Sequence, residues 1–205
     1  MFVFDFDGTI VDLWPRYCAV FKSIMQLNDL SLNDYKSIKQ KYKKDSLVAD
    51  YFGKELPEDY FSLKAALLED RDFLKLDIPL IGIDILNSVL IGNSMILTKR
   101  RNADNFLWQI KNLGICEKYQ VLNEEKKSDW VKTNTDEGNS ITVIGDSVAD
   151  LEIATLSNVD AWMVGYGLST RQDFDLQHIP YLYLETPNDL EILIRRRIIL
   201  CNSET

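Results

Sequence analysis

The chain has few of the residues that build zinc sites or disulfide frameworks. Its 205 residues include one histidine and three cysteines. Cys18, Cys116 and Cys201 lie far apart in the sequence and share no zinc-like spacing with His178. We therefore expect free thiols in a reducing compartment, and we assign no chemical role to the histidine.

Positive charge and long apolar runs are also scarce. The formal net charge is -9, which disfavours nucleic acids and anionic membranes as partners because both require a basic surface. No apolar run approaches the roughly 20 residues that span a bilayer. The first residues have the pattern of a strand rather than of a signal peptide. We expect a cytoplasmic protein with no nucleic-acid or membrane partner, and the sequence leaves its oligomeric state open.

Short apolar, β-rich runs recur along the chain, and helical patterns separate most of them. The runs are Phe2–Phe4, Met95–Leu97, Tyr119–Leu122, Ile141–Ile144, Ala161–Val164 and Tyr181–Leu184. The helical patterns are Ala103–Leu113, Ser128–Thr133, Val148–Leu156 and a closing helix at Asn188–Ile199. This alternation predicts an α/β fold with a doubly wound, Rossmann-like parallel sheet. Ligands of such sheets bind at the carboxyl ends of the strands.

The segment between the first two strands breaks the alternation. A stripe of apolar residues from Trp14 to Met25 has the spacing of one helix face, and helical patterns follow at Leu32–Lys44 and Asp59–Leu76. No strand is expected in this segment. We therefore predict an α/β core of residues 1–13 and 82–205, with an all-helical domain of residues 14–81 inserted after the first strand.

Asp5 and Asp7 follow directly after the first strand. Residues two apart on a strand point to the same side, so the two carboxylates can converge on one ligand. They repel each other unless a cation joins them or one takes a proton. Mg²⁺ is a hard cation that takes carboxylate, water and phosphate oxygens, and Gly8 lets the backbone turn sharply beside such a ligand. The alternative interpretation is a strand end whose acids merely cap a turn.

A second acidic cluster, Gly145-Asp146-Ser147-Val148-Ala149-Asp150, follows a later strand. Asp146 extends from the strand end, and Asp150 lies one helical turn further on. Asp150 alone would be compatible with an ordinary first-turn acid, which the helix dipole favours. Together with the first cluster, Asp146 supplies the further carboxylate that a magnesium site requires.

Between the two clusters, Thr98 ends the second strand, and Lys126 and Lys127 follow the third. A hydroxyl and an ammonium are the groups that a transferring phosphoryl group needs on its remaining oxygens. Thr98 is followed by Lys99-Arg100-Arg101, a cationic run that indicates either solvated charge or recognition of a second anionic group. The order of acids, Thr, Lys and acids, each after a strand, favours a phosphoryl-transfer site.

These elements resemble the four motifs of the haloacid dehalogenase superfamily, which are an Asp-x-Asp loop, a Ser/Thr, a Lys and an acidic pair. The stretch from Asp5 to Pro15 is similar to the opening of phosphoglycolate phosphatase-like members. The later stretch Gly145-Asp146-Ser147-x-x-Asp150, followed by Val164-Gly165-Tyr166-Gly167, is similar too. The resemblance covers the whole core and implies that the inserted helical domain is a cap between the first and second motifs.

The resemblance also implies a role for each matched residue. Asp5 would be the nucleophile, and Asp7 the general acid and then the general base. Thr98 and one lysine would hold the phosphoryl oxygens, and we favour Lys127 because it lies nearer the start of the following helix. The implied Mg²⁺ set is Asp5, Asp7 through its backbone carbonyl, Asp146 and Asp150, the last as a ligand or a brace. The implied substrate-binding set is Gly8, Thr98, Lys99 and Lys127.

The function that the resemblance implies is a magnesium-dependent phosphatase, which hydrolyses a small phosphomonoester through an aspartyl-phosphate intermediate. Asp7 favours phosphate over halide chemistry, because the second Asp is absent from dehalogenating relatives. A phosphomutase acting on a sugar phosphate is one alternative, and residues of the cap would decide between the two. A non-catalytic phosphate-binding or signalling protein on the same fold is the other.

Overall fold

The structure is a computed structural model that describes residues 1–134 and 140–203, with side chains as far as residue 198. The chain falls into two units. The α/β unit comprises Met1–Asp12 and Pro79–Thr205, and the helical unit comprises Leu13–Ile78. In the described part of the chain, no helix is both long enough and apolar enough to cross a membrane. Cys18 and Cys116 are free thiols, and Cys201 lies outside the described side chains.

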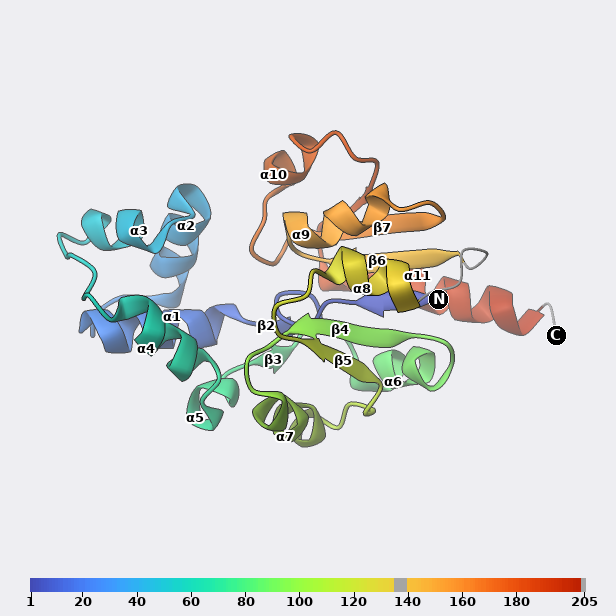
Figure 1. The fold of residues 1–205 in the computed structure, drawn as a ribbon, viewed down its shortest axis with the longest axis horizontal. Coiled ribbons are helices and arrows are strands. Elements are labelled where there is room, and N and C mark those ends of the chain that lie inside the picture. Colours follow the sequence, from blue (N-terminus) through green and yellow to red (C-terminus); the bar gives the residue numbers. More distant parts are fainter. Residues whose placement is uncertain (135–139, 204–205) are drawn as a thin grey trace. The chain divides into compact units, whose positions relative to one another are not determined.

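A six-stranded sheet forms the centre of the α/β unit (Figure 1). Its spatial order is β5-β4-β1-β6-β7-β8, and every neighbouring pair is parallel. The strands are β1 Phe2–Phe4, β4 Met95–Lys99, β5 Tyr119–Leu122, β6 Ile141–Gly145, β7 Val159–Val164 and β8 Leu182–Leu184. All six apolar runs therefore become strands, and the predicted α/β class with a doubly wound parallel sheet is confirmed.

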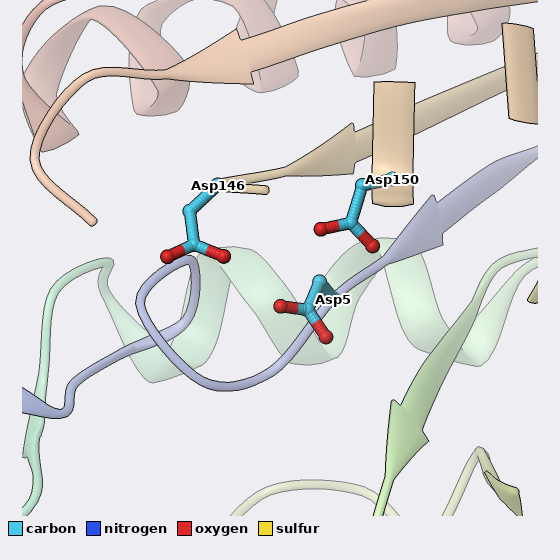
Figure 2. A group of neighbouring side chains, drawn as sticks. All are labelled: Asp5, Asp146 and Asp150. Carbon is cyan, nitrogen blue, oxygen red and sulfur yellow. The ribbon is translucent and has the colours of Figure 1, made fainter. Parts of the chain in front are cut away.

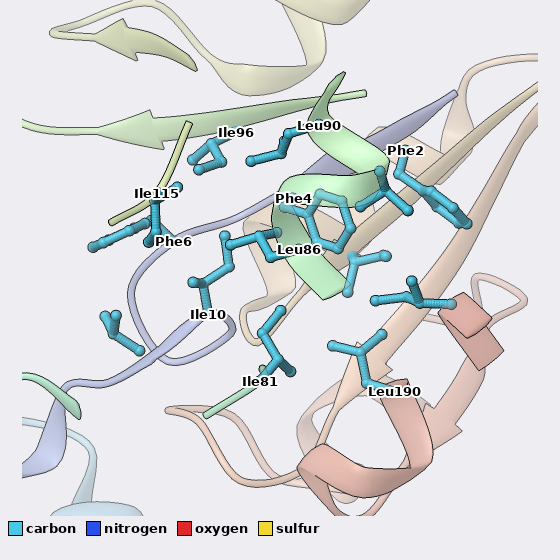
Figure 3. Close-up of a cluster of buried hydrophobic side chains, with 14 of the residues drawn as sticks. Phe2, Phe4, Phe6, Ile10, Ile81, Leu86, Leu90, Ile96, Ile115 and Leu190 are labelled. Carbon is cyan, nitrogen blue, oxygen red and sulfur yellow. The ribbon is translucent and has the colours of Figure 1, made fainter. Parts of the chain in front are cut away.

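The two faces of the sheet carry separate hydrophobic clusters because side chains alternate along each strand. On β1, Phe2 and Phe4 belong to one cluster and Val3 to the other. The first cluster packs against α6 (Ile83–Ile91), α7 (Ala103–Leu113) and α11 (Pro187–Ser203), as Figure 3 shows for Leu86 and Leu190. The second packs against α8 (Lys127–Asn134), α9 (Val148–Leu151), the 3₁₀ helix Glu152–Thr155 and α10 (Arg171–Asp175). Both faces are thus covered, as a parallel sheet requires.

The strand order reverses around β1. The chain builds β4 and β5 on one side of β1 and then β6, β7 and β8 on the other. Val3 pairs with Met95 on β4 and with Val143 on β6, so the carboxyl ends of these three strands lie side by side. Such a reversal leaves a crevice at the carboxyl ends of the flanking strands. The two acidic clusters of the sequence follow β1 and β6, at this edge of the sheet.

The helical unit contains α1 (Trp14–Met25), α2 (Leu32–Tyr42), α3 (Asp45–Tyr51), α4 (Tyr60–Leu68) and α5 (Arg71–Leu74). Its core is aromatic. The Phe21 ring lies 5.2 Å from the Tyr35 ring and 6.3 Å from the Tyr60 ring, between centroids. All three side chains are almost completely buried, and such aromatic pairs stabilise a small core beyond their buried area alone.

Two local expectations for residues 14–81 were wrong. The pattern over Asp59–Leu76 is divided between α4 and α5, because Asp70 caps α5 by accepting the backbone N–H of Asp72 at 2.8 Å. The segment was also expected to lack strands, but β3 (Ile78–Pro79) pairs with β2 (Val11–Asp12) in a second sheet. A pairing of two residues is too short to produce a periodic sequence pattern.

Candidate active site

Three carboxylates meet at the carboxyl edge of the α/β sheet (Figure 2). Asp5 follows β1, Asp146 follows the adjacent β6, and Asp150 belongs to α9. One oxygen from each lies within 4.8 Å of the others. Asp5 is 9% exposed, and Asp146 and Asp150 are each 1% exposed. Asp5 of the first predicted acidic cluster and both acids of the second therefore form one buried group, which does not include Asp7.

The side chain of Lys127 reaches into this group. Its Nζ donates to Oδ1 of Asp5 at 2.5 Å and to Oδ1 of Asp150 at 2.6 Å. Lys127 is the first residue of α8 and is buried, whereas Lys126 precedes the helix and is exposed. Of the two neighbouring lysines, Lys127 is therefore the one that contacts the carboxylates.

Asp150 is fixed by contacts to both of its oxygens. Oδ1 accepts from Lys127, and Oδ2 accepts from the backbone N–H and the hydroxyl of Ser147 in a capping box at the start of α9. With both oxygens engaged, Asp150 is suited to brace Lys127. Asp146 is held differently, because its Oδ2 accepts the backbone N–H of Leu168 at 2.6 Å.

Burial strongly affects ionisation in this group. The pKa of Asp5 is raised from 3.8 to about 7, because the loss of water outweighs the stabilising charge of Lys127. Burial also raises the pKa of Asp146 well above its usual range, and the charges of Asp5 and Asp150 raise it further. For Lys127, burial alone would lower the pKa, but Asp150 and Asp5 raise it above its ordinary value.

The donor set fits a divalent cation. Three buried carboxylates face the single ammonium of Lys127, so their full ionisation would leave a net negative charge. Burial is the main cause of the raised pKa values of Asp5 and Asp146, and the neighbouring carboxylates raise them further. A bound divalent cation would offset the net negative charge, and carboxylate oxygens are the ligands that hard cations such as Mg²⁺ and Ca²⁺ prefer.

The loop that carries Asp5 is fixed by backbone contacts. Gly8 has a φ of +81°, a left-handed conformation that favours glycine, and its N–H donates to the carbonyl of Val11 at 2.9 Å. Asp5 donates its own N–H to Ile144 of β6 at 2.8 Å. These contacts position Asp5 beside the strand that carries Asp146.

A second loop, Gly165–Ser169 after β7, holds Asp146 from the other side. A Cβ atom on Gly167 would overlap the Asp146 side chain, so the close approach requires glycine. In the same loop, the Tyr166 hydroxyl donates to the carbonyl of Thr9 at 3.4 Å. The loop therefore links the Asp146 end of the site to the Asp5 loop.

Asp7 lies in the same loop as Asp5, but its carboxylate contacts a different cation. Arg100 donates through an η nitrogen to Oδ1 of Asp7 at 2.8 Å. The interpretation of Lys99-Arg100-Arg101 as solvated charge is therefore wrong for Arg100, which is 4% exposed, whereas Lys99 and Arg101 are exposed. Thr98 is buried in β4, two residues beyond the Ile96–Phe4 pairing, which places it at the same edge of the sheet.

Sequence reasoning missed three contributors to the site. Arg100 was visible only as part of a charged run, and its partner Asp7 lies 93 residues away. Leu168 acts through its backbone N–H, for which its side chain gives no signal. Tyr166 stands in the Val164–Gly167 stretch that the resemblance marked, but its contact with Thr9 depends on the tertiary structure.

A doubly wound parallel sheet with a buried lysine among three carboxylates at its carboxyl edge defines the class of the fold. Solved structures identify it further. The chain is similar to a haloacid dehalogenase-like hydrolase from Streptococcus pneumoniae, with 18% identity, a TM-score of 0.63 and coverage of 94% of this chain and 95% of that chain. No protein-family model matches the sequence, and no curated protein matches it.

Two further structures have the same architecture. One is a haloacid dehalogenase family hydrolase from Deinococcus radiodurans with bound phosphate and sodium, at 13% identity and a TM-score of 0.64, with 92% of each chain covered. The other is a predicted phosphoglycolate phosphatase from Haemophilus somnus, at 15% identity and a TM-score of 0.62, with 94% of this chain and 97% of that chain covered. The chain therefore has the haloacid dehalogenase-like hydrolase fold, and the resemblance seen in its motifs is confirmed at the level of the fold.

Proposed function

We propose that the protein is a magnesium-dependent phosphatase that hydrolyses a small phosphomonoester through an aspartyl-phosphate on Asp5. The observation that carries this proposal is the buried contact of Lys127 with Asp5 and Asp150, beside Asp146. This arrangement occurs at the carboxyl edge of a fold shared with named phosphatases. One structural relative with that fold contains bound phosphate, which supports the same reaction class.

The first half of the reaction transfers the phosphoryl group to the enzyme. A carboxylate oxygen of Asp5 attacks phosphorus, and the bond between phosphorus and the ester oxygen breaks. Asp7 gives its proton to the departing oxygen, which leaves as an alcohol. The Lys127 ammonium lies 2.5 Å from Asp5 and offsets negative charge on the phosphoryl oxygens. Thr98 holds another of these oxygens.

The second half restores the enzyme. Asp7, now ionised, accepts a proton from a water molecule as the water oxygen attacks phosphorus. The bond between phosphorus and Asp5 breaks, which releases phosphate and the free carboxylate. The backbone of the Gly8 turn and the exposed Lys99 complete the proposed substrate site, with Lys99 available to a second anionic group.

Asp5, Asp146 and the backbone carbonyl of Asp7 would hold Mg²⁺, with Asp150 as the brace. When bound, Mg²⁺ neutralises charge on the carboxylates and on the phosphoryl oxygens. The raised pKa values of Asp5 and Asp146 support this assignment, since burial disfavours their ionised forms and a bound cation would favour them. Three protein oxygens would be too few for a calcium cage and match the small number of protein ligands that Mg²⁺ usually takes.

The helical unit would act as the cap that restricts the enzyme to small substrates. The unit enters the chain directly after the Asp5 loop and β2, and the chain returns at β3. An inserted cap of this kind would exclude bulk water during the reaction and so strengthen the charge interactions on which phosphoryl transfer depends. The proposed partner is therefore a small-molecule phosphomonoester rather than a phosphoprotein.

A panel of small phosphomonoesters and phosphopeptides tests this proposal. Phosphate release is measured with Mg²⁺, with Ca²⁺ and with a chelator, and the Asp5→Asn variant serves as the control for contaminating phosphatases. We expect turnover of small esters with Mg²⁺ only, because the higher and looser coordination of Ca²⁺ misplaces the attacking oxygen. Full activity in chelator would contradict the metal assignment. A sugar phosphate that isomerises without releasing phosphate would identify a phosphomutase instead.

A further inference from the structure

The guanidinium of Arg100 is enclosed by groups from two parts of the α/β unit. It donates to Asp7 at 2.8 Å and to Oε1 of Gln109 on α7 at 3.1 Å. Its central carbon lies 5.7 Å from the centroid of the Phe6 ring and 5.6 Å from that of the Phe106 ring. These two rings meet edge to face at 4.9 Å. Arg100 is thus held by cation–π contacts and by a buried amide as well as by Asp7.

Burial excludes direct contact between Arg100 and a substrate in this arrangement. The Arg100 side chain is 3% exposed, whereas the Asp7 side chain is 21% exposed. Gln109, which anchors Arg100 from α7, is 2% exposed. Solvent and ligands therefore reach the Asp7 end of this chain of contacts and not the arginine. Any effect of Arg100 on a reaction must act through Asp7.

The geometry restricts the direction of the Asp7 carboxyl group. A guanidinium is planar and has its donors in a fixed arrangement, and a single η nitrogen of Arg100 donates to both Gln109 and Asp7, so its contact with Gln109 also fixes how it faces Asp7. The ion pair through Oδ1 limits rotation of the carboxyl group, and Phe6, the neighbour of Asp7 in the chain, packs on the same guanidinium. A lysine has a single flexible ammonium and would restrict the Asp7 carboxyl group less.

We propose that Arg100 is a positioning residue that aims the Asp7 carboxyl group at the oxygen of the departing alcohol. This inference rests on the proposed function, in which Asp5 attacks phosphorus, the bond from phosphorus to the ester oxygen breaks, and Asp7 supplies the proton that this oxygen takes. Misplacement of an acid matters most when the leaving group is basic, because a weakly basic leaving group departs without a proton. The effect of Arg100 should therefore depend on the leaving group.

Two esters that differ by one methylene group separate positioning from a general structural role. In p-nitrobenzyl phosphate the leaving group is a basic alkoxide, and in p-nitrophenyl phosphate it is a stable phenolate. The measured quantity is kcat/KM, because it reports the steps up to and including departure of the alcohol. Asp7→Asn is the reference variant, and Arg101→Met is the matched control, since it removes the same charge from the adjacent exposed position.

We expect Arg100→Met to lower kcat/KM for the benzyl ester at least tenfold more than for the phenyl ester. Asp7→Asn should have the same selectivity with a larger loss, Arg100→Lys should recover part of the loss, and Arg101→Met should leave the ratio unchanged. If Arg100→Met prevents folding, Gln109→Met tests the inference instead, because it keeps the guanidinium but removes the hydrogen bond that holds it to α7. In that variant a selective loss of about threefold supports the inference.

Equal losses on both esters in the Arg100 and Gln109 variants, with a selective loss in Asp7→Asn, would overturn this inference and leave the proposed function intact. A wild-type enzyme that hydrolyses neither ester, or an Asp7→Asn variant without selectivity, would instead overturn the proposed chemistry and this inference with it.

Discussion

The two units of the molecule each contain a buried cluster of charges, and the balance of charge in the two clusters is opposite. In the α/β unit, three carboxylates face the single ammonium of Lys127. In the helical unit, one carboxylate, Asp45, accepts from Lys39 at 2.7 Å and from Lys64 at 2.6 Å. The first cluster has an excess of negative charge when fully ionised, and the second has an excess of positive charge.

The pKa values of the central carboxylates, Asp45 and Asp5, are shifted in opposite directions. Burial opposes ionisation of Asp45, yet Lys64 and Lys39 together lower its pKa below the ordinary value. Burial of Asp5 is not compensated in this way, and its pKa is raised to about 7. Burial of charge is therefore not by itself a sign of function. A buried carboxylate that is paired with enough neighbouring cations contributes to the fold. A cluster of buried carboxylates without enough cations is suited to bind a charged ligand.

Replacing the central acid of the uncompensated cluster should give the largest effect. Asp5→Asn removes the nucleophile while keeping its size, so we expect kcat to fall by about a thousandfold or more. Steady-state phosphate release measures this loss, and circular dichroism checks that the fold is retained. A variant that kept more than about a tenth of the wild-type kcat would show that Asp5 is not the nucleophile.

Replacing the acid of the compensated cluster, formed by Asp45, Lys39 and Lys64, should instead lower the stability of the protein. Asp45→Asn leaves Lys39 and Lys64 without their carboxylate, and we expect the free energy of unfolding to fall by about 3 kcal/mol. Urea unfolding measures this change, with amide hydrogen exchange in α2 to α4 locating it in the helical unit. The matched control is Asp72→Asn, whose 2.7 Å pair with Lys75 is exposed to solvent and should contribute nothing measurable. Equal effects of the two substitutions would remove the distinction between the clusters.

The neighbouring lysines offer a sharper test within the α/β unit. Lys127→Ala leaves Asp5 and Asp150 without their shared ammonium, whereas Lys126→Ala removes an exposed side chain. We expect kcat/KM to be lower in the Lys127 variant than in the Lys126 variant by tenfold or more. The reverse ranking would mean that Lys127 has only a structural role.

The smallest expected effect is a change of stability with pH in the metal-free protein. The pKa of Asp5 is raised from 3.8 to about 7, so the folded chain keeps a proton that the unfolded chain has already lost. Stability must then fall as the pH rises through about 7, by about 1 kcal/mol between pH 6 and 8. Urea unfolding at the two pH values measures this. Asp5→Asn should reduce the change, with Asp146, whose pKa is also raised, contributing what remains, and saturating Mg²⁺ should reduce it because the bound cation favours the ionised carboxylates. Asp45, with its lowered pKa, titrates outside this window.

The sequence predicted the sheet well because strands buried on both faces are continuous apolar runs between turn signals. Helix α7 was predicted with the correct bounds, since Asn102 caps its start and Gly114 takes the left-handed conformation at its end. The break between α4 and α5 was missed because the cap at Asp70 interrupts an otherwise continuous helical pattern. Periodicity measures average spacing and is insensitive to one local cap.

For the site, strand order was sufficient to predict which acids belong to one edge of the sheet. Which oxygen contacts which partner could not be predicted. The capping box of Ser147 with Asp150 is local, but its consequence, that both oxygens of Asp150 are engaged, also depends on Lys127. The burial of Arg100 against Asp7 depends on contacts across 93 residues and has no periodic signature.

The central position of β1 also has a consequence for the order of folding. Lys127 and Asp5 are 122 residues apart in the chain, and β1 cannot be completed until β4 and β6 flank it. Contacts between distant residues form slowly, because the intervening chain must first be closed into a loop. We therefore expect the carboxylates to meet late, after the locally connected helices have formed. Pulsed amide exchange during refolding should find α1 and α4 protected before β1. If the carboxylates meet last, they repel one another only after the surrounding strands have formed and can resist that repulsion.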